Sequence, residues 1–188
     1  MDLTVIVHFP LPFGEINKLD NETNHLLNHF KTVVKVDYDL GGLKEVLAEE
    51  NLYEWGFWLR HMCTCLYGED LSQCFEQMKP NEKISSALNK DLLPLISSYR
   101  KELLTEKVSK SKKRSMLKRL IRGVYLTINV KDESWSTSID ENLMIIQQYF
   151  PKEVLFRKVA PMLHTEDEIS NQTLLTVLED FLDWFIKS

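Results

Sequence analysis

The sequence predicts a protein of the α+β class that is predominantly α-helical, with a small sheet near its N-terminus. Two short runs rich in β-branched residues, at 3–9 and 32–39, flank a segment with helical periodicity at 15–31. After the glycine pair Gly41 and Gly42, the remaining periodic segments have helical spacing. These observations favour a small α/β region followed by a helical bundle.

The order of the first three segments defines the expected domain organisation. Strand, helix and strand, with a crossover of this length, indicate a βαβ unit or a mixed sheet. We expect residues 1–42 to form this α/β region and residues 43–188 to form the helical domain. A chain of 188 residues is long enough to bury a substantial core.

Turn residues divide the helical domain. Helices are expected over 43–50 and 52–67, and Gly68 is placed as the C-terminal stop of the second. A long helical stretch is expected over 84–128, interrupted or kinked near Pro94.

Two capping patterns predict the last helix starts. Ser138 and Glu141 have the spacing of a capping box, and the helix that they open should end before Pro151. Thr165 and Glu168 repeat this spacing before the final apolar helix.

The run VVKVDYDLGGL, at 33–43, is the first candidate for a site. Side chains alternate along a strand, so Asp37 and Asp39 share one face while Tyr38 points to the other. The strand should break at the glycine pair. Carboxylates are the ligands that Mg²⁺ prefers, so a site for a hard cation is one interpretation. A solvated face of an edge strand is the other.

A basic segment is the second candidate. Between Arg100 and Arg122 there are ten basic residues and only two acidic ones, although the chain has a net charge of −5. Arg114, Lys118 and Arg122 recur at four-residue steps, so they lie along one helix face and could bind a triphosphate. A compact positive patch on an acidic protein favours a phosphate-bearing ligand over bulk nucleic acid. A solvated helix surface is the alternative.

Composition indicates a soluble cytoplasmic protein. No apolar run approaches the length of a membrane span, and the N-terminus has no signal-peptide pattern. The three cysteines, which fall inside predicted helices, form no even framework, and this favours a reducing compartment.

Two histidine patterns carry weaker hypotheses. His25 and His29 are four residues apart and face the same side of a helix, a geometry that can hold a metal, but the sequence offers no third ligand. Arg157 and His164 loosely match the spacing of a family of helical ribonucleases, although Pro161 should disturb their helix. The chain has no Walker-type phosphate loop, no GxGxxG and no nucleophile elbow.

The order of the features resembles a known superfamily. An acidic strand, a glycine break, WGFWLRHMCTCLYGEDLS, KRSMLKRLIRGVYLTI and ESWSTSIDENLMIIQQYFP together resemble the nucleotidyltransferases of the DNA polymerase beta-type superfamily. The bacterial group that includes antibiotic (aminoglycoside-type) nucleotidyltransferases is the most similar. The resemblance covers residues 2–155 and implies a partial nucleotidyltransferase α/β head followed by a C-terminal helical domain.

The resemblance also implies site residues. In this family three acids hold Mg²⁺ ions, which bind a nucleoside triphosphate for in-line attack by a substrate hydroxyl. Asp2 matches the second acid and Asp37 the third, with Asp39 as the fallback on the same face. Lys118 and Arg122 would contact the triphosphate.

The acceptor and the partners follow from the same resemblance. The acceptor would be a small hydroxyl compound or a protein side chain. Tyr125 and Trp135 are candidates for stacking on a base or on the acceptor, and core packing, the commoner role of such residues, is the alternative for both. Nucleic acid and membrane are not expected as partners. A homodimer is conceivable, because a missing strand would leave a sheet edge exposed.

The family's Gly-Ser turn and its first acid have no counterpart in this sequence. We therefore expect a nucleotidyltransferase-type chain that is either a shortened form or a relative without activity, and in both cases inactive or very weak in transfer. The alternative, from another class, is a non-catalytic helical module that binds nucleotide or protein. A remote third possibility is a helical protein that binds or cleaves RNA.

Overall fold

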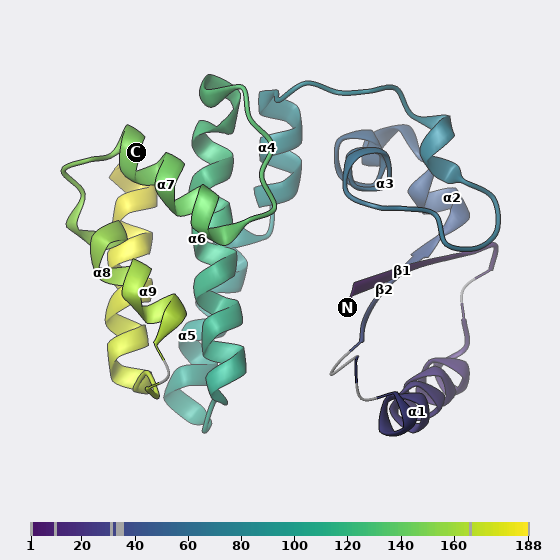
Figure 1. Cartoon of the computed structure of the whole chain (residues 1–188), viewed down its shortest axis with the longest axis horizontal. Coiled ribbons are helices and arrows are strands. Elements are labelled where there is room, and N and C mark those ends of the chain that lie inside the picture. The colour runs from purple at the N-terminus through teal and green to yellow at the C-terminus, as the bar shows by residue number, and fades with distance from the viewer. Residues whose placement is uncertain (1, 10, 31, 33–35, 166, 188) are drawn as a thin grey trace. The chain divides into compact units, whose positions relative to one another are not determined.

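The computed structural model describes residues 2–9, 11–30, 32, 36–165 and 167–187. The described part is mostly helical and contains one two-stranded sheet, so the predominantly helical α+β class is confirmed (Figure 1). The chain divides into two compact units, Met1–Met78 and Lys79–Ser188. The boundary expected after residue 42 coincides with the end of the sheet, whereas the division between the compact units lies 36 residues later, after Met78.

The sheet of the first unit is parallel. Strand β1 (Asp2–Val7) pairs with β2 (Asp37–Gly42), and helix α1 (Phe13–His29) lies between them in the chain. Parallel neighbours need a crossover, which α1 supplies, so the expected βαβ order is confirmed. The hydroxyl groups of Thr23 on α1 and Tyr38 on β2 lie 2.5 Å apart, which ties the helix to one face of the sheet.

The second strand ends at the glycine pair, as predicted, and includes both glycines. Gly41 and Gly42 are the last residues of β2 and pair with Ile6 and Val7, and α2 begins directly after them. A Cβ atom at Gly41 would lie 2.7 Å from a methyl carbon of Val46 and would also crowd Trp55. Glycine therefore allows the next segment to pack closely on the strand. Residues 33–35 of the predicted strand lie outside the described residues.

Four short helical pieces replace the two helices expected over 43–67. They are α2 (Leu43–Val46), the 3-10 helix η1 (Glu49–Asn51), the π-helix η2 (Leu52–Gly56) and α3 (Phe57–His61). Gly68 has a φ of 83°, but it stands in a turn well after α3 has ended, so its predicted role as a helix stop is wrong. Cys63 and Cys65 therefore lie outside helices, contrary to expectation, and a further 3-10 helix, η3 (Leu71–Cys74), ends at the third cysteine.

The second unit is a helical bundle. Its helices are α4 (Glu82–Asn89), α5 (Leu92–Thr105), α6 (Lys110–Asp132), α7 (Ile139–Tyr149), α8 (Val154–His164) and α9 (Asn171–Lys187).

The helical stretch expected over 84–128 is divided into α4, α5 and α6. The break at 90–91, between α4 and α5, agrees with the interruption predicted near Pro94, and a second break at 106–109 separates α5 from α6. Pro94 lies in the first turn of α5, where a missing N–H leaves no intrahelical bond unmade, so it produces no kink. Pro161 likewise lies inside α8 without ending it, contrary to the expected disturbance.

One of the two predicted caps is correct. The hydroxyl of Ser138 accepts a hydrogen bond from the backbone N–H of Glu141, as a capping box requires of its first member. The cap predicted at Thr165 is wrong. Thr165 ends α8, and the hydroxyl of Ser170 instead accepts from the N–H of Thr173 at the start of α9.

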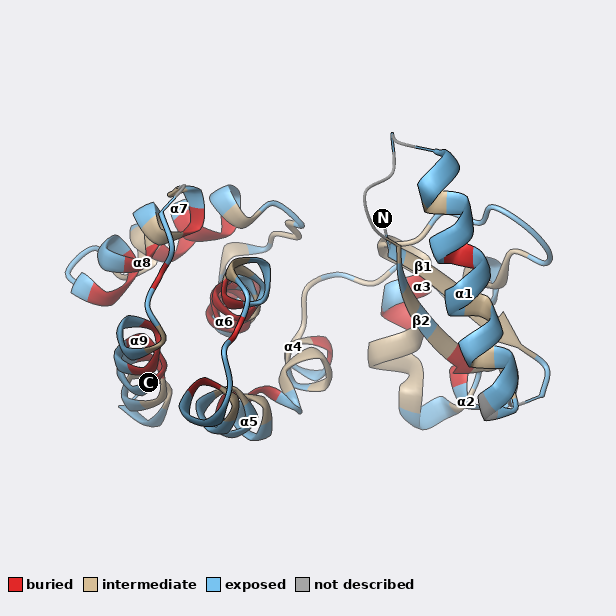
Figure 2. Cartoon of the chain, turned by 90° about the horizontal axis from the view of Figure 1, so that it is seen from below, coloured by how far each residue is buried: buried red, intermediate tan, exposed pale blue. Residues whose placement is uncertain are grey.

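The core of the second unit centres on α6. The apolar face predicted for this helix is buried at Leu117, Leu120, Ile121 and Val124, each with no exposed surface. Buried residues of α6, α7, α8 and α9 form one hydrophobic cluster, and Figure 2 colours parts of these four helices as buried. In the same view α1 of the first unit is mostly exposed.

Candidate functional site

The acidic face of the sheet brings together the first group of predicted site residues. In the parallel register Asp2 stands opposite Asp37, and Thr4 stands opposite Asp39. Register partners in parallel strands point to the same face, at a Cα separation of about 4.8 Å. The three carboxylates therefore share one face, and all three residues are exposed.

The segment after β2 covers the inner part of this face. The Sγ atom of Cys63 lies 3.8 Å from the hydroxyl of Thr4, and the packing of Trp55 on Gly41 is on the same side. Tyr38 points the other way, toward α1. The alternation predicted for Asp37, Tyr38 and Asp39 is thus present in the structure.

Asp39 occupies an electrostatically unfavourable position. Its pKa is raised, first by partial burial and then by the negative charges of Glu54 and Glu45. Carboxylates that repel one another on a partly desolvated surface favour the uptake of a cation or a proton. This set of oxygen donors fits a hard cation such as Mg²⁺ better than it fits a softer metal.

Two neighbouring side chains are unsuited to nucleophilic chemistry. Burial raises the pKa of the Cys63 thiol, and the charge of Asp39 adds to this shift, so the thiol stays protonated at neutral pH. His61 accepts a hydrogen bond from the backbone N–H of Met78 at 2.9 Å, and burial lowers its pKa. Both residues serve the packing of the first unit.

The predicted triphosphate residues belong to the second unit. Lys118 and Arg122 are exposed on α6, opposite its buried apolar face, as the four-residue spacing predicted. Arg114, at the start of the same stripe, instead donates a hydrogen bond to the carbonyl oxygen of Thr165. The usable basic surface is therefore shorter than the sequence suggested.

The two aromatic residues considered for stacking, Tyr125 and Trp135, are both at least partly buried. Tyr125 is only 2% exposed, and its hydroxyl donates to the backbone oxygen of Ser134 at 2.9 Å, so this residue packs in the core, which was the alternative to stacking. Trp135 is half-buried in the loop after α6.

The histidine pairs are on helices, as their spacing required. His25 and His29 are exposed near the end of α1, and their ring centroids lie 4.8 Å apart. Arg157 and His164 are both on α8, where the Nε2 atom of His164 lies 2.9 Å from a carboxylate oxygen of Asp140. This contact between His164 and Asp140 lies at the surface, because both side chains are exposed.

Sequence reasoning missed Glu45 and Glu54. They approach Asp39 only because the chain turns sharply through α2, η1 and η2. No local periodicity in the sequence indicates that these residues lie near Asp39. Acidic residues such as Glu45 and Glu54 are typical of any solvated helix.

The structure also has a hollow of about 690 Å³ that no sequence pattern indicated. It is lined by residues of α8 and α9 and of the segment before α8, including Trp184, Leu155, Lys158 and Asp180. Lys158 and Asp180 form an ion pair across it at 3.2 Å.

Within the described residues, no three His, Cys, Asp or Glu side chains are close enough together to form a metal site. None of the helices in the described part of the chain combines the length and apolar character needed to cross a membrane. No protein-family model, curated protein or solved structure matches the chain.

Proposed function

We propose that this chain is a nucleotidyltransferase-type protein that binds Mg²⁺ and a nucleoside triphosphate. Asp2 and Asp37 would ligate the cation, with Asp39 beside them. The observation that supports this most is the strand register, which sets Asp2 opposite Asp37 on the face that also carries Asp39. Two carboxylates on adjacent strands can share one ion, and Mg²⁺ typically takes one or two carboxylates together with phosphate oxygens.

In this proposal the acidic and the basic residues of the chain have different roles. The carboxylates would hold the cation, which when bound neutralises charge on the triphosphate. Lys118 and Arg122, exposed on α6 of the second unit, are the residues to which the family resemblance assigns contacts with phosphate oxygens. The acceptor in this proposal is a small hydroxyl compound or a protein hydroxyl group.

A titration of the whole chain with ATP, GTP, CTP and UTP, with and without Mg²⁺, tests the proposal. A ligand that binds only the folded state raises the melting temperature, so at least one triphosphate should do so in the presence of Mg²⁺. Asp37→Asn should abolish the Mg²⁺-dependent part of the shift. The matched control is Asp20→Asn on α1, an exposed aspartate away from the acidic face, which should keep it. A shift that survives in Asp37→Asn would overturn the assignment.

The triphosphate contacts are tested separately. The double variant Lys118→Gln/Arg122→Gln should weaken binding of the triphosphate while leaving the fold intact, because both side chains are exposed. Lys101→Gln on α5 removes a cation of similar exposure and should have no such effect.

A second candidate function is a non-catalytic binding module. The observation that favours it is a loop after α3 in which Leu66 is 78% exposed and Tyr67 is 98% exposed. Exposed aromatic and aliphatic side chains are typical of protein contacts. Absence of any triphosphate-dependent shift would favour this candidate, and retention of a partner by wild type but not by Leu66→Ser/Tyr67→Ser would support it.

A further inference from the structure

The last turns of α1 carry a pair of imidazole groups outside the acidic face. His25 and His29 are four residues apart on a regular helix, so they stand one above the other on the same side. Both are exposed, and most of α1 around them faces solvent (Figure 2). Their ring centroids are 4.8 Å apart, with the ring planes tilted by 54°.

One hydrogen bond determines which nitrogen of His29 can act as a ligand. The Nδ1 atom of His29 lies 2.9 Å from the carbonyl oxygen of His25. A carbonyl oxygen only accepts, so Nδ1 carries the proton and donates, and Nε2 of the neutral ring has a free lone pair. A backbone carbonyl on the other ring nitrogen is the outer partner that metal-bound histidines usually have.

The spacing of the rings suits a shared ion. With metal–nitrogen distances of roughly 2.0–2.1 Å, two imidazoles that bind one ion at about a tetrahedral angle have centroids about 5 Å apart. The observed 4.8 Å is close to this value. Two histidines at this spacing on one helix face are also the chelating pair of helical zinc sites.

We propose that His25 and His29 form a two-histidine chelate for a borderline transition-metal ion such as Zn²⁺, Ni²⁺ or Cu²⁺. Solvent completes the coordination, since no group of three His, Cys, Asp or Glu ligands exists among the described residues. The ion links the last two turns of α1, a helix in which Thr23 is the one buried residue among the side chains described. The site is independent of the proposed Mg²⁺ site, because imidazole selects a different class of metal from carboxylate oxygens.

Titration of the whole chain with Co²⁺, Ni²⁺, Cu²⁺ and Zn²⁺, followed by calorimetry, tests this site. We expect one ion per chain, with affinity rising from Co²⁺ to Ni²⁺ to Cu²⁺. His29→Gln should weaken binding by about 100-fold, because the second ligand of a chelate binds as an intramolecular partner. Mg²⁺ should neither bind this site nor compete for it, so the result is separable from that of the triphosphate titration.

A matched variant makes the test specific to geometry. Asn24→His/His25→Asn keeps the composition and moves one imidazole to the neighbouring exposed position, about 100° around the helix. It should bind as weakly as His29→Gln, whereas His8→Gln/His164→Gln should bind as tightly as wild type. Equal affinity of wild type and Asn24→His/His25→Asn would overturn the proposal, as would loss of binding in His8→Gln/His164→Gln. Far-UV circular dichroism shows that each variant retains its helices.

Discussion

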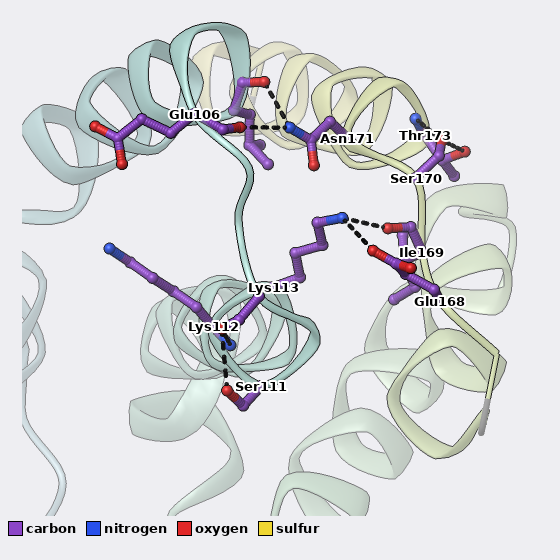
Figure 3. Close-up of polar contacts among 11 residues, drawn as sticks. Glu106, Ser111, Lys112, Lys113, Glu168, Ile169, Ser170, Asn171 and Thr173 are labelled. Carbon is purple, nitrogen blue, oxygen red and sulfur yellow. Dashed lines mark hydrogen bonds and ion pairs between the residues drawn. The ribbon is translucent and has the colours of Figure 1, made fainter.

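The ammonium nitrogen of Lys113 lies 2.7 Å from the backbone oxygen of Ile169, and only 3% of this lysine is exposed (Figure 3). Glu168 adds a carboxylate oxygen at 3.6 Å. The next residue, Arg114, donates to the carbonyl oxygen of Thr165. Two consecutive basic residues near the start of α6 therefore hold both ends of the segment that joins α8 to α9.

Replacing Lys113 by Met should destabilise the second unit by about 2 kcal/mol, because the carbonyl of Ile169 loses a charged donor in a site without water access. Urea denaturation followed by far-UV circular dichroism measures the loss. Lys112→Met is the control: Lys112 is an exposed lysine that pairs with Glu102 at the surface, so its removal should have little effect. An equal loss in both variants would show that burial of Lys113 is not the cause.

Asn171, the first residue of α9, should contribute to stability by satisfying backbone carbonyls at the C-terminal end of α5. Its side-chain amide donates to the carbonyl oxygens of Leu103 at 2.8 Å and Glu106 at 3.1 Å, which have no donor within α5 (Figure 3). Asn171→Ala should cost about 1–2 kcal/mol of unfolding free energy. Gln172→Ala, at the adjacent exposed position, should be close to neutral. Thermal denaturation of the two variants provides the measurement. Asn171→Ala should lower the melting temperature, and Gln172→Ala should leave it nearly unchanged.

Gly123 should not tolerate a methyl group. A Cβ atom there would lie 2.6 Å from a methyl carbon of Leu92, which is itself 96% buried and so has little room to move. We expect Gly123→Ala to destabilise by about 1–2 kcal/mol, because overpacking outweighs the gain in helix propensity.

Gly14 provides the opposite case for the same substitution. It lies in the first turn of α1, and a Cβ atom there meets nothing within 4 Å. Gly14→Ala should be neutral or stabilise by up to about 1 kcal/mol. If both alanine variants move the melting temperature in the same direction, the contact with Leu92 does not determine the effect at Gly123.

Asp39 should make stability depend on pH in an unusual direction. Its pKa in the folded protein is raised above the ordinary 3.8 by burial and by Glu54 and Glu45, so the folded state binds more protons than the unfolded state above that pH. The contribution of Asp39 to the free energy of unfolding therefore falls as the pH rises from 3.8 through the pKa of Asp39 in the folded protein.

The variant Asp39→Asn removes this dependence. It should be more stable than wild type at pH 7, and the difference should disappear near pH 3.5, where both states of the wild type are largely protonated at this position. Melting temperatures of the two proteins across this range provide the measurement. A stability difference that is the same at both pH values would contradict an electrostatic cause.

Much of the fold was predictable because the signals are local. The apolar face of α6, the cap at Ser138 and the strand–helix–strand order each depend on residues within a few positions of one another. The same holds for the candidate site, since alternation along β2 is enough to place Asp37 and Asp39 on one face. Asp2 was considered with them only through the resemblance to the nucleotidyltransferases.

The helix ends were not predictable in the same way. The stretch over 84–128, for which the sequence predicted an interruption or kink near Pro94, forms three helices whose exact ends the spacing does not give. Arg119, far along the chain, donates to the carbonyl oxygen of Leu88 at 3.0 Å and to the carboxylate of Asp91 at 2.6 Å, and so satisfies the end of α4. A helix can end where distant groups satisfy its free carbonyls, and sequence spacing does not contain that information.

By itself, the sequence determined which residues share a face of each element, since side-chain direction follows from the backbone period. Only the tertiary structure decided which of those faces is covered and by what. It set Asp2 opposite Asp37, brought Glu45 and Glu54 toward Asp39, and buried the charged group of Lys113 against Ile169. The reason is physical: pairing, burial and electrostatic environment depend on groups distant in the chain, and these meet only when the elements pack.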